Sequence, residues 1–389
     1  MECGKAGELA VPAKLSNEEE RTVTGDSDSI MCGENRSTDE NSMSGRNGSE
    51  DLAVEETMET EFLQGVYVIQ TAADGRFIKR MKEYLTYEEA AGACGVDEEI
   101  LLLRQEISGK SEWYNGLMPP DNLNPESVKT FLKLTHEHYE EVFGGSFPKE
   151  VKGFFTDEPN CCDFFSVFHE GRPWIPWSIG FTEYFIEKRG YDPQEKLPYL
   201  FFDGEGAEKI RHDYWKTVAQ RFEESYMKQV YEWCDKRGLR TTGHILYEND
   251  LGYQTRVCGA AMPQLRYLHN PGIDLLGAQT DEYLTVKQCA SVAHQYERSM
   301  TISEAYGCTG WELDFSTQKW LGDWQFALGI TRRCQHLALY SITGCRKRDY
   351  PPVFNYQNTW WDDNDKMENY FGRLALCLSQ GEPVRKVLM

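Results

Sequence analysis

The sequence has few basic residues for its length and no long apolar run. Lys and Arg number 41 against 63 Asp and Glu, which gives the 389 residues a net charge of −22. Such an excess of negative charge repels nucleic acids and anionic membrane surfaces, so neither is an expected partner. No apolar stretch approaches the roughly 20 residues that cross a bilayer, and Met1-Glu-Cys-Gly-Lys-Ala6 does not begin a signal peptide. We therefore expect a soluble, cytoplasmic protein.

The cysteines lack any recognisable metal or disulfide pattern. The twelve of them are scattered, only Cys161 and Cys162 are adjacent, and no Cys-x-x-Cys occurs. This arrangement argues against a zinc site or a compact disulfide framework and favours reduced thiols. Aromatic residues are plentiful at 13%, including ten tryptophans. Flat aromatic faces suit sugar rings, although large cores use the same residues.

The composition divides the chain into three parts. Residues 1–60 are poor in aromatics and hold 5 basic and 15 acidic residues, so we expect a disordered acidic segment or a loose insertion. Residues 61–110 contain short apolar runs around Val66, Phe77 and Ile100 that indicate a small β-rich excursion. Residues 111–389 form the expected catalytic domain.

From residue 111 onward, buried strands alternate with helices. This alternation predicts parallel strands joined by right-handed crossovers, and about six such units can be counted. The fold class is therefore α/β, a (β/α)8 TIM-type barrel that is incomplete at its N-terminal units. Val384-Arg-Lys-Val-Leu-Met389 begins a further strand. We expect a fragment, with the missing barrel or β-sandwich portions supplied by a longer parent protein.

Several boundaries follow from capping and breaking residues. Asn124 is an expected N-cap with Pro125 at the first helical position, and the helix should close near Gly144. One long helix is predicted over residues 207–237. Further strands are predicted at 239–247, 271–277 and 300–306, followed by a helix at 320–337 and a last strand at 337–343.

Two glutamates end strands in the same way. The run Val151-Lys-Gly-Phe-Phe-Thr-Asp-Glu-Pro159 should stop as a strand at Asp157 and Glu158, because Pro159 cannot donate to a sheet. Glu304 ends a later strand, three strands away in order. Strands three apart face each other across a barrel mouth, so both carboxylates should enter one pocket. Paired carboxylates are what the cleavage of a glycosidic bond requires, one as acid and one as nucleophile or base.

These motifs resemble known glycosidases. Phe155-Thr-Asp-Glu-Pro159 and Ser303-Glu-Ala-Tyr-Gly307 are similar to the ends of strands four and seven in clan A glycoside hydrolases. A closer resemblance is to the bacterial family 106 α-L-rhamnosidase group. It rests on six phrases between residue 111 and the C-terminus: Thr135-His-Glu-His-Tyr139, Phe155-Thr-Asp-Glu-Pro159, Gly243-His244 with Glu248, Pro271-Gly-Ile-Asp274, Ser303-Glu304 with Gly310-Trp311, and Lys347-Arg-Asp-Tyr-Pro351.

The resemblance implies Glu158 as general acid/base and Glu304 as nucleophile or base. It also implies an inverting, calcium-dependent reaction, in which one of these glutamates becomes a metal ligand or the base for a water. From the residues alone we expect no cofactor and assign no metal ligand. A catalytically inactive carbohydrate-binding barrel fragment is the alternative from another class. The accessory β-sandwiches usual in the family are not evident.

Other side chains near the strand ends are candidates for substrate binding, each with a structural alternative. His244 donates to a sugar hydroxyl, orients Glu158, or is a core histidine. Asp157 supports Glu158 or caps a helix, and Asp349 and Tyr350 end the last strand within reach of a substrate. The full set of substrate-binding candidates is Asp157, His244, Glu248, Asn249, Trp113, Tyr114, Tyr306 and Trp311.

Overall fold

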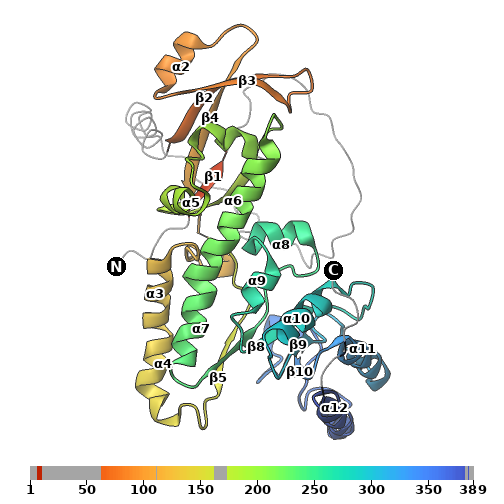
Figure 1. Ribbon diagram of the computed structural model, residues 1–389. Helices are drawn as coiled ribbons and strands as arrows, with labels where there is room; N and C mark the ends of the chain where they lie inside the picture. The colour runs from red at the N-terminus through yellow and green to blue at the C-terminus, as the bar shows by residue number, and fades with distance from the viewer. Residues whose placement is uncertain (1–6, 11–62, 111, 162–172, 382–383, 385–389) are drawn as a thin grey trace, which may run out of the picture.

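The computed structural model describes residues 7–10, 63–110, 112–161, 173–381 and 384. Its strands form two five-stranded sheets, one antiparallel in the order β3-β2-β4-β1-β6 and one parallel in the order β10-β9-β8-β7-β5. Figure 1 shows the antiparallel sheet at one end of the molecule and the curled parallel sheet at the other, with a long helix running between them. The acidic segment expected at residues 1–60 lies, apart from 7–10, outside the described residues.

Strand β2 of the antiparallel sheet is buried on both of its faces. Tyr67 and Ile69 face the main core, whereas Val66 and Val68 face the opposite side and pack with Ala90 of helix α2 (Tyr87–Ala93). This alternation follows from the two-residue repeat of a strand. Its strands are β1 (Gly7–Ala10), β2 (Leu63–Thr71), β3 (Ile78–Tyr84), β4 (Glu99–Ile107) and β6 (Trp174–Trp177).

The apolar runs predicted as strands near residues 66, 77 and 100 are observed as β2, β3 and β4. Strand β6 joins the same sheet through β1, although it comes from the part of the chain assigned to the barrel.

Long helices connect the two sheets. Asn124 caps α3 (Pro125–Leu134) by accepting from the Glu126 amide, as its sequence predicts. The expected continuation to residue 144 is broken at Thr135, after which α4 begins. The helix predicted at 207–237 is observed with a π-helical turn in its middle. These helices are α4 (His136–Phe143), α5 (Phe181–Arg189), α6 (Ala207–Phe222), the π-turn η4 (Glu223–Met227) and α7 (Lys228–Asp235).

The parallel sheet carries the candidate site at its carboxyl edge. Asp274 and Glu304 are paired in register, so their side chains stand at the same level of the sheet. The strands are β5 (Gly153–Thr156), β7 (Arg240–Gly243), β8 (Asn270–Leu275), β9 (Ile302–Ala305) and β10 (Arg332–Gln335). The helices that follow are α8 (Leu251–Cys258), α9 (Ala261–Leu265), α10 (Leu284–Gln295), α11 (Phe315–Leu328) and α12 (Asn364–Leu378).

A glycine allows β7 to approach β5 closely just before the site. Gly243 has φ +136°, and a Cβ atom added there would lie 1.9 Å from the Thr156 carbonyl oxygen. Only glycine accepts both this dihedral angle and this contact. The chain therefore leaves β7 at a fixed place and direction, with His244 as the next residue.

Two expectations are corrected. The described residues contain five parallel strands rather than the predicted six or so units, and these strands form a curled sheet. The helix predicted at 320–337 ends instead at Leu328, where Gly329 adopts φ +123°, and the last strand is 332–335 rather than 337–343. The apolar run after residue 337 attracted the strand prediction, yet its Tyr340 is 98% exposed. No helix in the described ranges combines the length and apolarity needed to cross a bilayer.

Candidate active site

A cavity of about 450 Å³ opens at the carboxyl ends of the parallel strands. This is the edge at which α/β sheets and barrels gather their functional side chains. Glu158 and Glu304, the predicted pair, both line it. The complete lining is Asp157, Glu158, Ile245, Leu246, Tyr247, Glu248, Asn249, Asp274, Leu275, Leu276, Gln279, Glu304, His336 and Tyr350.

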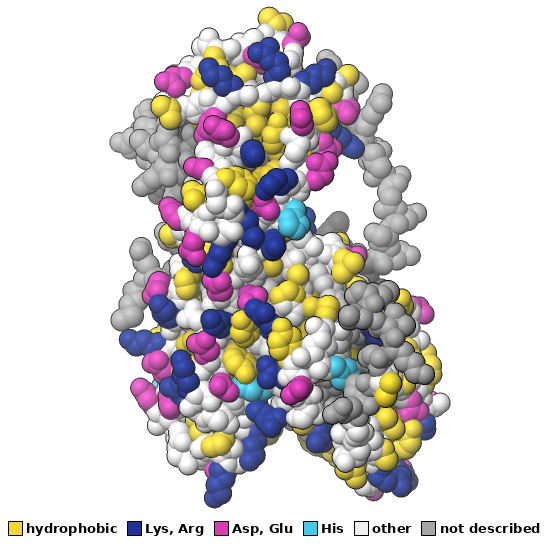
Figure 2. All heavy atoms as spheres, in the orientation of Figure 1, with side chains coloured by type: hydrophobic (Ala, Val, Ile, Leu, Met, Phe, Trp, Pro, Cys, Tyr) yellow, Lys and Arg dark blue, Asp and Glu magenta, His cyan; other side chains and the backbone are white. Residues whose placement is uncertain are grey.

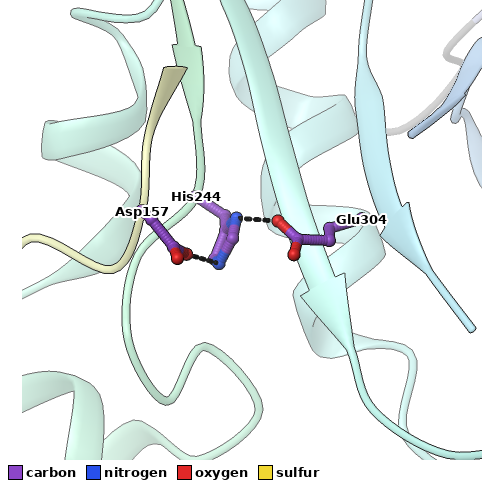
Figure 3. Close-up of side chains that lie close together, drawn as sticks. All are labelled: Asp157, His244 and Glu304. Carbon is purple, nitrogen blue, oxygen red and sulfur yellow. Dashed lines mark ion pairs between the residues drawn. The ribbon is translucent and has the colours of Figure 1, made fainter. Parts of the chain in front are cut away.

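His244 lies at the centre of the acidic side chains and is only 1% exposed. Its Nε2 atom is 3.2 Å from Asp157 Oδ1, and its Nδ1 atom is 3.6 Å from Glu304 Oε2. Figure 3 shows the imidazole between these two carboxylates, one at the end of β5 and the other on β9. A third carboxylate, Asp274, has an oxygen 3.9 Å from Nε2. His244 therefore links the ends of three other strands.

The surroundings of His244 keep its ring protonated at neutral pH. Burial by itself lowers the pKa of a histidine. Here the contact with Asp157, followed by the charges of Glu248, Asp274 and Glu304, outweighs burial and raises the pKa to about 9. The side chain thus supplies a fixed positive charge between the carboxylates. In return, its hydrogen bond holds the pKa of Asp157 below the usual range.

Glu158 is placed by an unusual backbone. It adopts φ +46°, a left-handed conformation that is rare for a residue with a side chain and that tends to occur at functional sites. Burial raises the pKa of its carboxyl group, and the charges of Asp157 and Glu304 add to this effect, while His244 opposes it. A carboxyl group with these neighbours holds its proton to higher pH than an exposed glutamate does.

Glu304 lies between two imidazoles. Besides His244 on one oxygen, His336 places Nε2 3.8 Å from Oε1 of Glu304. Burial raises the pKa of Glu304, and the two histidines counteract that shift. The two glutamates therefore differ in the number of imidazole neighbours, two for Glu304 and one for Glu158, while the charge of Asp157 raises the pKa of both.

Glu248 has a structural task at the cavity wall. Its Oε1 accepts from the Ile245 amide at 3.2 Å and its Oε2 from the Asp274 amide at 3.1 Å, so it joins the loop after β7 to β8. Burial raises its pKa to about 8, and the pKa of neighbouring Asp274 rises to about 7 for the same reason. Glu248 is 5% exposed, and Asn249 lies beside it in the lining.

Three other predicted residues, Tyr306, Trp311 and Tyr114, are not part of the cavity lining. Tyr306 is completely buried and bonds to the Gln318 carbonyl and to Arg333, so its prediction as a substrate-binding residue is wrong. Trp311 donates its indole N–H to the Lys347 carbonyl at 2.6 Å. Tyr114 is in the short helix η1 (Glu112–Tyr114) and is not part of the lining. The side chain of Trp113 lies outside the described residues.

The sequence reasoning missed His336, Gln279 and Tyr247 as site residues. The helix predicted at 320–337 includes His336 at its C-terminal end. The residue instead follows β10, a strand without an apolar signal because it reads Arg-Arg-Cys-Gln. Tyr247 was placed within a strand that in fact ends at Gly243. Asp274 could have been named, since the predicted strand at 271–277 contains it between the strands of the other acids.

The fit of the site to calcium is partial. Two trios of side chains bring ligand atoms within 4.8 Å of one another, and each trio contains His244 and two carboxylates. They are Asp157, His244 and Glu304, and Glu158, His244 and Asp274. Calcium takes six to eight oxygen ligands, whereas His244 offers nitrogen that is already protonated. The described residues therefore do not form a calcium cage by themselves.

Paired carboxylates at the carboxyl edge of a curled parallel β/α sheet are the arrangement expected of a glycoside hydrolase. The comparison with protein families agrees: the profile of glycoside hydrolase family 106, described as alpha-L-rhamnosidase, matches residues 120–389. This chain belongs to that family.

Among solved structures, the fold is similar to that of a rhamnosidase from Novosphingobium sp. PP1Y. The TM-score is 0.56 and the sequences are 19% identical, with 78% of this chain and 30% of that chain covered. The present chain thus spans about a third of the length of that protein. A search of curated proteins found no significant match.

Proposed function

We propose that this chain carries the active site of a glycoside hydrolase that cleaves α-L-rhamnosides, with Glu158 as general acid and Glu304 as base or nucleophile. One observation supports this most strongly. Both glutamates line the same cavity, at the ends of strands separated by two others, and His244 lies among them. The choice of sugar rests on family membership, because the matching family is described as alpha-L-rhamnosidase.

Glu158 is suited to the acid role by its surroundings. A general acid must hold its proton near neutral pH and release it to the leaving oxygen. Burial and the negative charges of Asp157 and Glu304 favour the protonated form of Glu158. Once Glu158 has given up the proton, the nearby His244 charge stabilises the carboxylate.

Glu304 is suited to the second role. The imidazoles of His244 and His336 face its two oxygen atoms and stabilise the ionised carboxylate. An ionised carboxylate either removes a proton from the attacking water, which inverts the anomeric centre, or attacks that centre itself, which retains the configuration. Analysis of the first-formed product by proton NMR would distinguish the two, because the anomers give separate signals.

Asp157 and Asp274 contribute two further carboxyl groups to the candidate site. Asp157 is ionised and remains 73% exposed, so it is accessible to sugar hydroxyl groups. Asp274 is more buried and its pKa is about 7, so near neutral pH it accepts or donates a hydrogen bond according to its protonation. The acids therefore present both ionised and protonated groups to a polyhydroxylated ligand.

Calcium dependence is a second proposal, motivated by the carboxylate pairs. The ion would supply positive charge for sugar hydroxyls, and it would need further oxygen ligands. Activity that falls on chelation and returns with added calcium would support it, as would calcium binding seen by calorimetry. Unchanged activity after exhaustive chelation would favour the arrangement in which His244 alone supplies the positive charge.

The deciding experiment is an assay with 4-nitrophenyl glycosides on wild type, Glu158→Gln and Glu304→Gln. Turnover of the α-L-rhamnoside, lost in both variants, is the expected result. Sugar binding without turnover in the wild type would instead favour the inactive carbohydrate-binding alternative. Equal turnover in all three proteins would remove both glutamates from the mechanism.

A further inference from the structure

One wall of the cavity is apolar, in contrast to the acids. Leu276 follows β8 and is 49% exposed, and Tyr350 follows η5 (Gly344–Arg348) and is 44% exposed. Both line the cavity. Large apolar side chains with this exposure inside a cavity are available to a ligand.

Leu276 and Tyr350 are connected through packed neighbours. A Cβ atom added to Gly307 would lie 3.3 Å from Leu276 Cδ2 and 3.6 Å from His336 Cγ, so these two side chains flank Gly307. The His336 ring in turn meets the Tyr350 ring edge-on, with centroids 6.0 Å apart. Leu276 and Tyr350 are therefore joined through Gly307 and His336, and we name these two side chains the apolar wall.

The backbone that carries Tyr350 is held on both sides. The Trp311 indole donates to the carbonyl of Lys347, and the Gly310 amide donates to the carbonyl of Pro351 at 3.1 Å. Between these anchors Tyr350 adopts φ +49°, a left-handed conformation that aromatic residues seldom adopt. Such conformations persist where surrounding contacts impose them, and they concentrate at ligand sites. The Tyr350 ring is thus pre-organised at the cavity.

Tyr350 lines the same cavity as Glu158, the proposed acid. In agreement, the charge of Glu158 adds to the effects of burial, Cys308 and Asp349 that raise the pKa of the Tyr350 phenol. A sugar ring that lies against the Tyr350 face is therefore within reach of Glu158. Aromatic faces pack well against the C–H groups of a pyranose ring, and such a platform fixes the ring without forming a bond to it.

We propose that the apolar wall selects a 6-deoxyhexose: Tyr350 packs against the sugar ring and Leu276 packs against the methyl group on C5, where a 6-hydroxyl would be buried without a partner. This inference rests on the proposed function and adds the residues that set its sugar specificity. Trp311 is a positioning residue that holds the Tyr350 loop. The relevant pair of ligands is L-rhamnose and L-mannose, which differ only by the hydroxyl on C6.

The test measures binding of the free sugars by isothermal titration calorimetry, so it does not depend on turnover. Wild type should bind L-rhamnose about 10- to 100-fold more tightly than L-mannose, the range expected when an apolar site meets one added hydroxyl. Leu276→Asn should reduce that ratio by about 10-fold. Leu251→Asn, at another exposed leucine outside the lining, is the matched control and should leave the ratio unchanged.

Tyr350 is tested by size and by polarity. Tyr350→Ala should weaken binding of both sugars by about 10-fold, whereas Tyr350→Phe should stay within about 3-fold of wild type because the face remains. Tyr356→Ala, at a tyrosine that is 71% exposed and outside the lining, is the control. Trp311→Phe should raise KM for the rhamnoside more than it lowers kcat, because it loosens the platform and leaves the glutamates in place.

The outcomes separate this inference from the proposed function. If the protein binds L-rhamnose and L-mannose with the predicted affinity ratio but does not hydrolyse the rhamnoside, the hydrolase proposal is overturned and the proposed role of the apolar wall is kept. If the wild type hydrolyses the rhamnoside, but Leu276→Asn leaves the affinity ratio unchanged and Tyr350→Ala leaves sugar binding unchanged, only the proposed role of the apolar wall is overturned. Wild type that binds L-mannose as tightly as L-rhamnose, or binds neither sugar, would also overturn it.

Discussion

The Nδ1 atom of His244 lies 3.6 Å from Oε2 of Glu304, so side chains from the ends of β7 and β9 meet across the intervening strand β8. This contact places one positive charge next to the carboxylate proposed to act as base or nucleophile. Because the same ring also contacts Asp157, the residue directly after β5, a change at any of the three alters the electrostatics of the others.

Removal of either proposed catalytic glutamate should abolish most activity. Glu158→Gln cannot donate a proton, and Glu304→Gln cannot attack or activate water, so we expect kcat to fall by at least about 100-fold in each. Steady-state kinetics on a rhamnoside with a poor leaving group would show this. Glu183→Gln on the exposed face of α5 is the control and should be unaffected. A drop of less than 3-fold in Glu158→Gln would contradict its role.

The pH dependence of kcat/KM should reflect the protonation of Glu158, the proposed general acid. The protonated form of Glu158 is required, and its raised pKa moves the basic limb to higher pH than an ordinary glutamate would give. Asp157→Asn removes a charge that raises this pKa, so the basic limb should shift to lower pH. Asp365→Asn, an exposed acid of α12, should leave the profile in place. A basic limb that persists unchanged in Glu158→Gln would show that another group is the acid.

His244 should make stability depend on pH. Its pKa is about 9 in the folded protein against 6.5 for an unperturbed histidine, so its contribution is fully present below pH 6.5 and is lost as the pH rises through 9. His244→Gln should therefore lower the free energy of unfolding by roughly 2 to 3 kcal/mol near pH 6. The difference from wild type should narrow above pH 9.

Denaturant titrations at several pH values would measure this difference. The raised pKa values of Glu248 and Asp274 also make the wild type less stable as the pH rises. The variant and the wild type must therefore be compared at the same pH. A gap between His244→Gln and wild type that widens with rising pH would refute the assignment of a charged imidazole.

Gly243→Ala should disrupt the site through the backbone. The added Cβ atom would lie 1.9 Å from the Thr156 carbonyl oxygen and would need a φ of +136°. We expect a loss of about 3 kcal/mol or more in the free energy of unfolding, because strands β5 and β7 must separate. Thermal unfolding would measure it. Gly92→Ala, where an added Cβ atom of α2 meets nothing, should be neutral or stabilising by up to about 1 kcal/mol.

The sequence predicted what depends on strong local signals. Pro159 marked the end of β5, Gly243 preceded His244, and the strand of Glu304 fell within one or two residues of its observed place. The pairing of the two glutamates in one cavity followed from counting strands. These inferences succeeded because parallel strands with short crossovers leave few alternative arrangements.

Other features could not be predicted because they depend on tertiary contacts. Strand β10 has no apolar pattern, and its buried Arg333 is stabilised by Glu368 and by stacking on Phe371, which only the folded chain brings near. His336 was therefore missed. Tyr306 was misassigned because burial cannot be read from a motif: its ring packs on Phe354, behind the site.

The helix that runs from α6 through η4 to α7 ties the two ends of the molecule together. Figure 2 shows side chains continuing without a break from one end of the molecule to the other. One hydrophobic core includes Tyr67 and Leu103 from the antiparallel sheet together with Val257 and Cys289 beside the parallel sheet. We therefore expect the described parts of the chain to unfold together, with the antiparallel sheet supporting the candidate site through this shared core. Deletion of residues 63–110 would remove Tyr67, Ile69, Ile78, Leu101 and Leu103 from this shared core, so we expect it to destabilise the part of the chain that carries Glu158 as well.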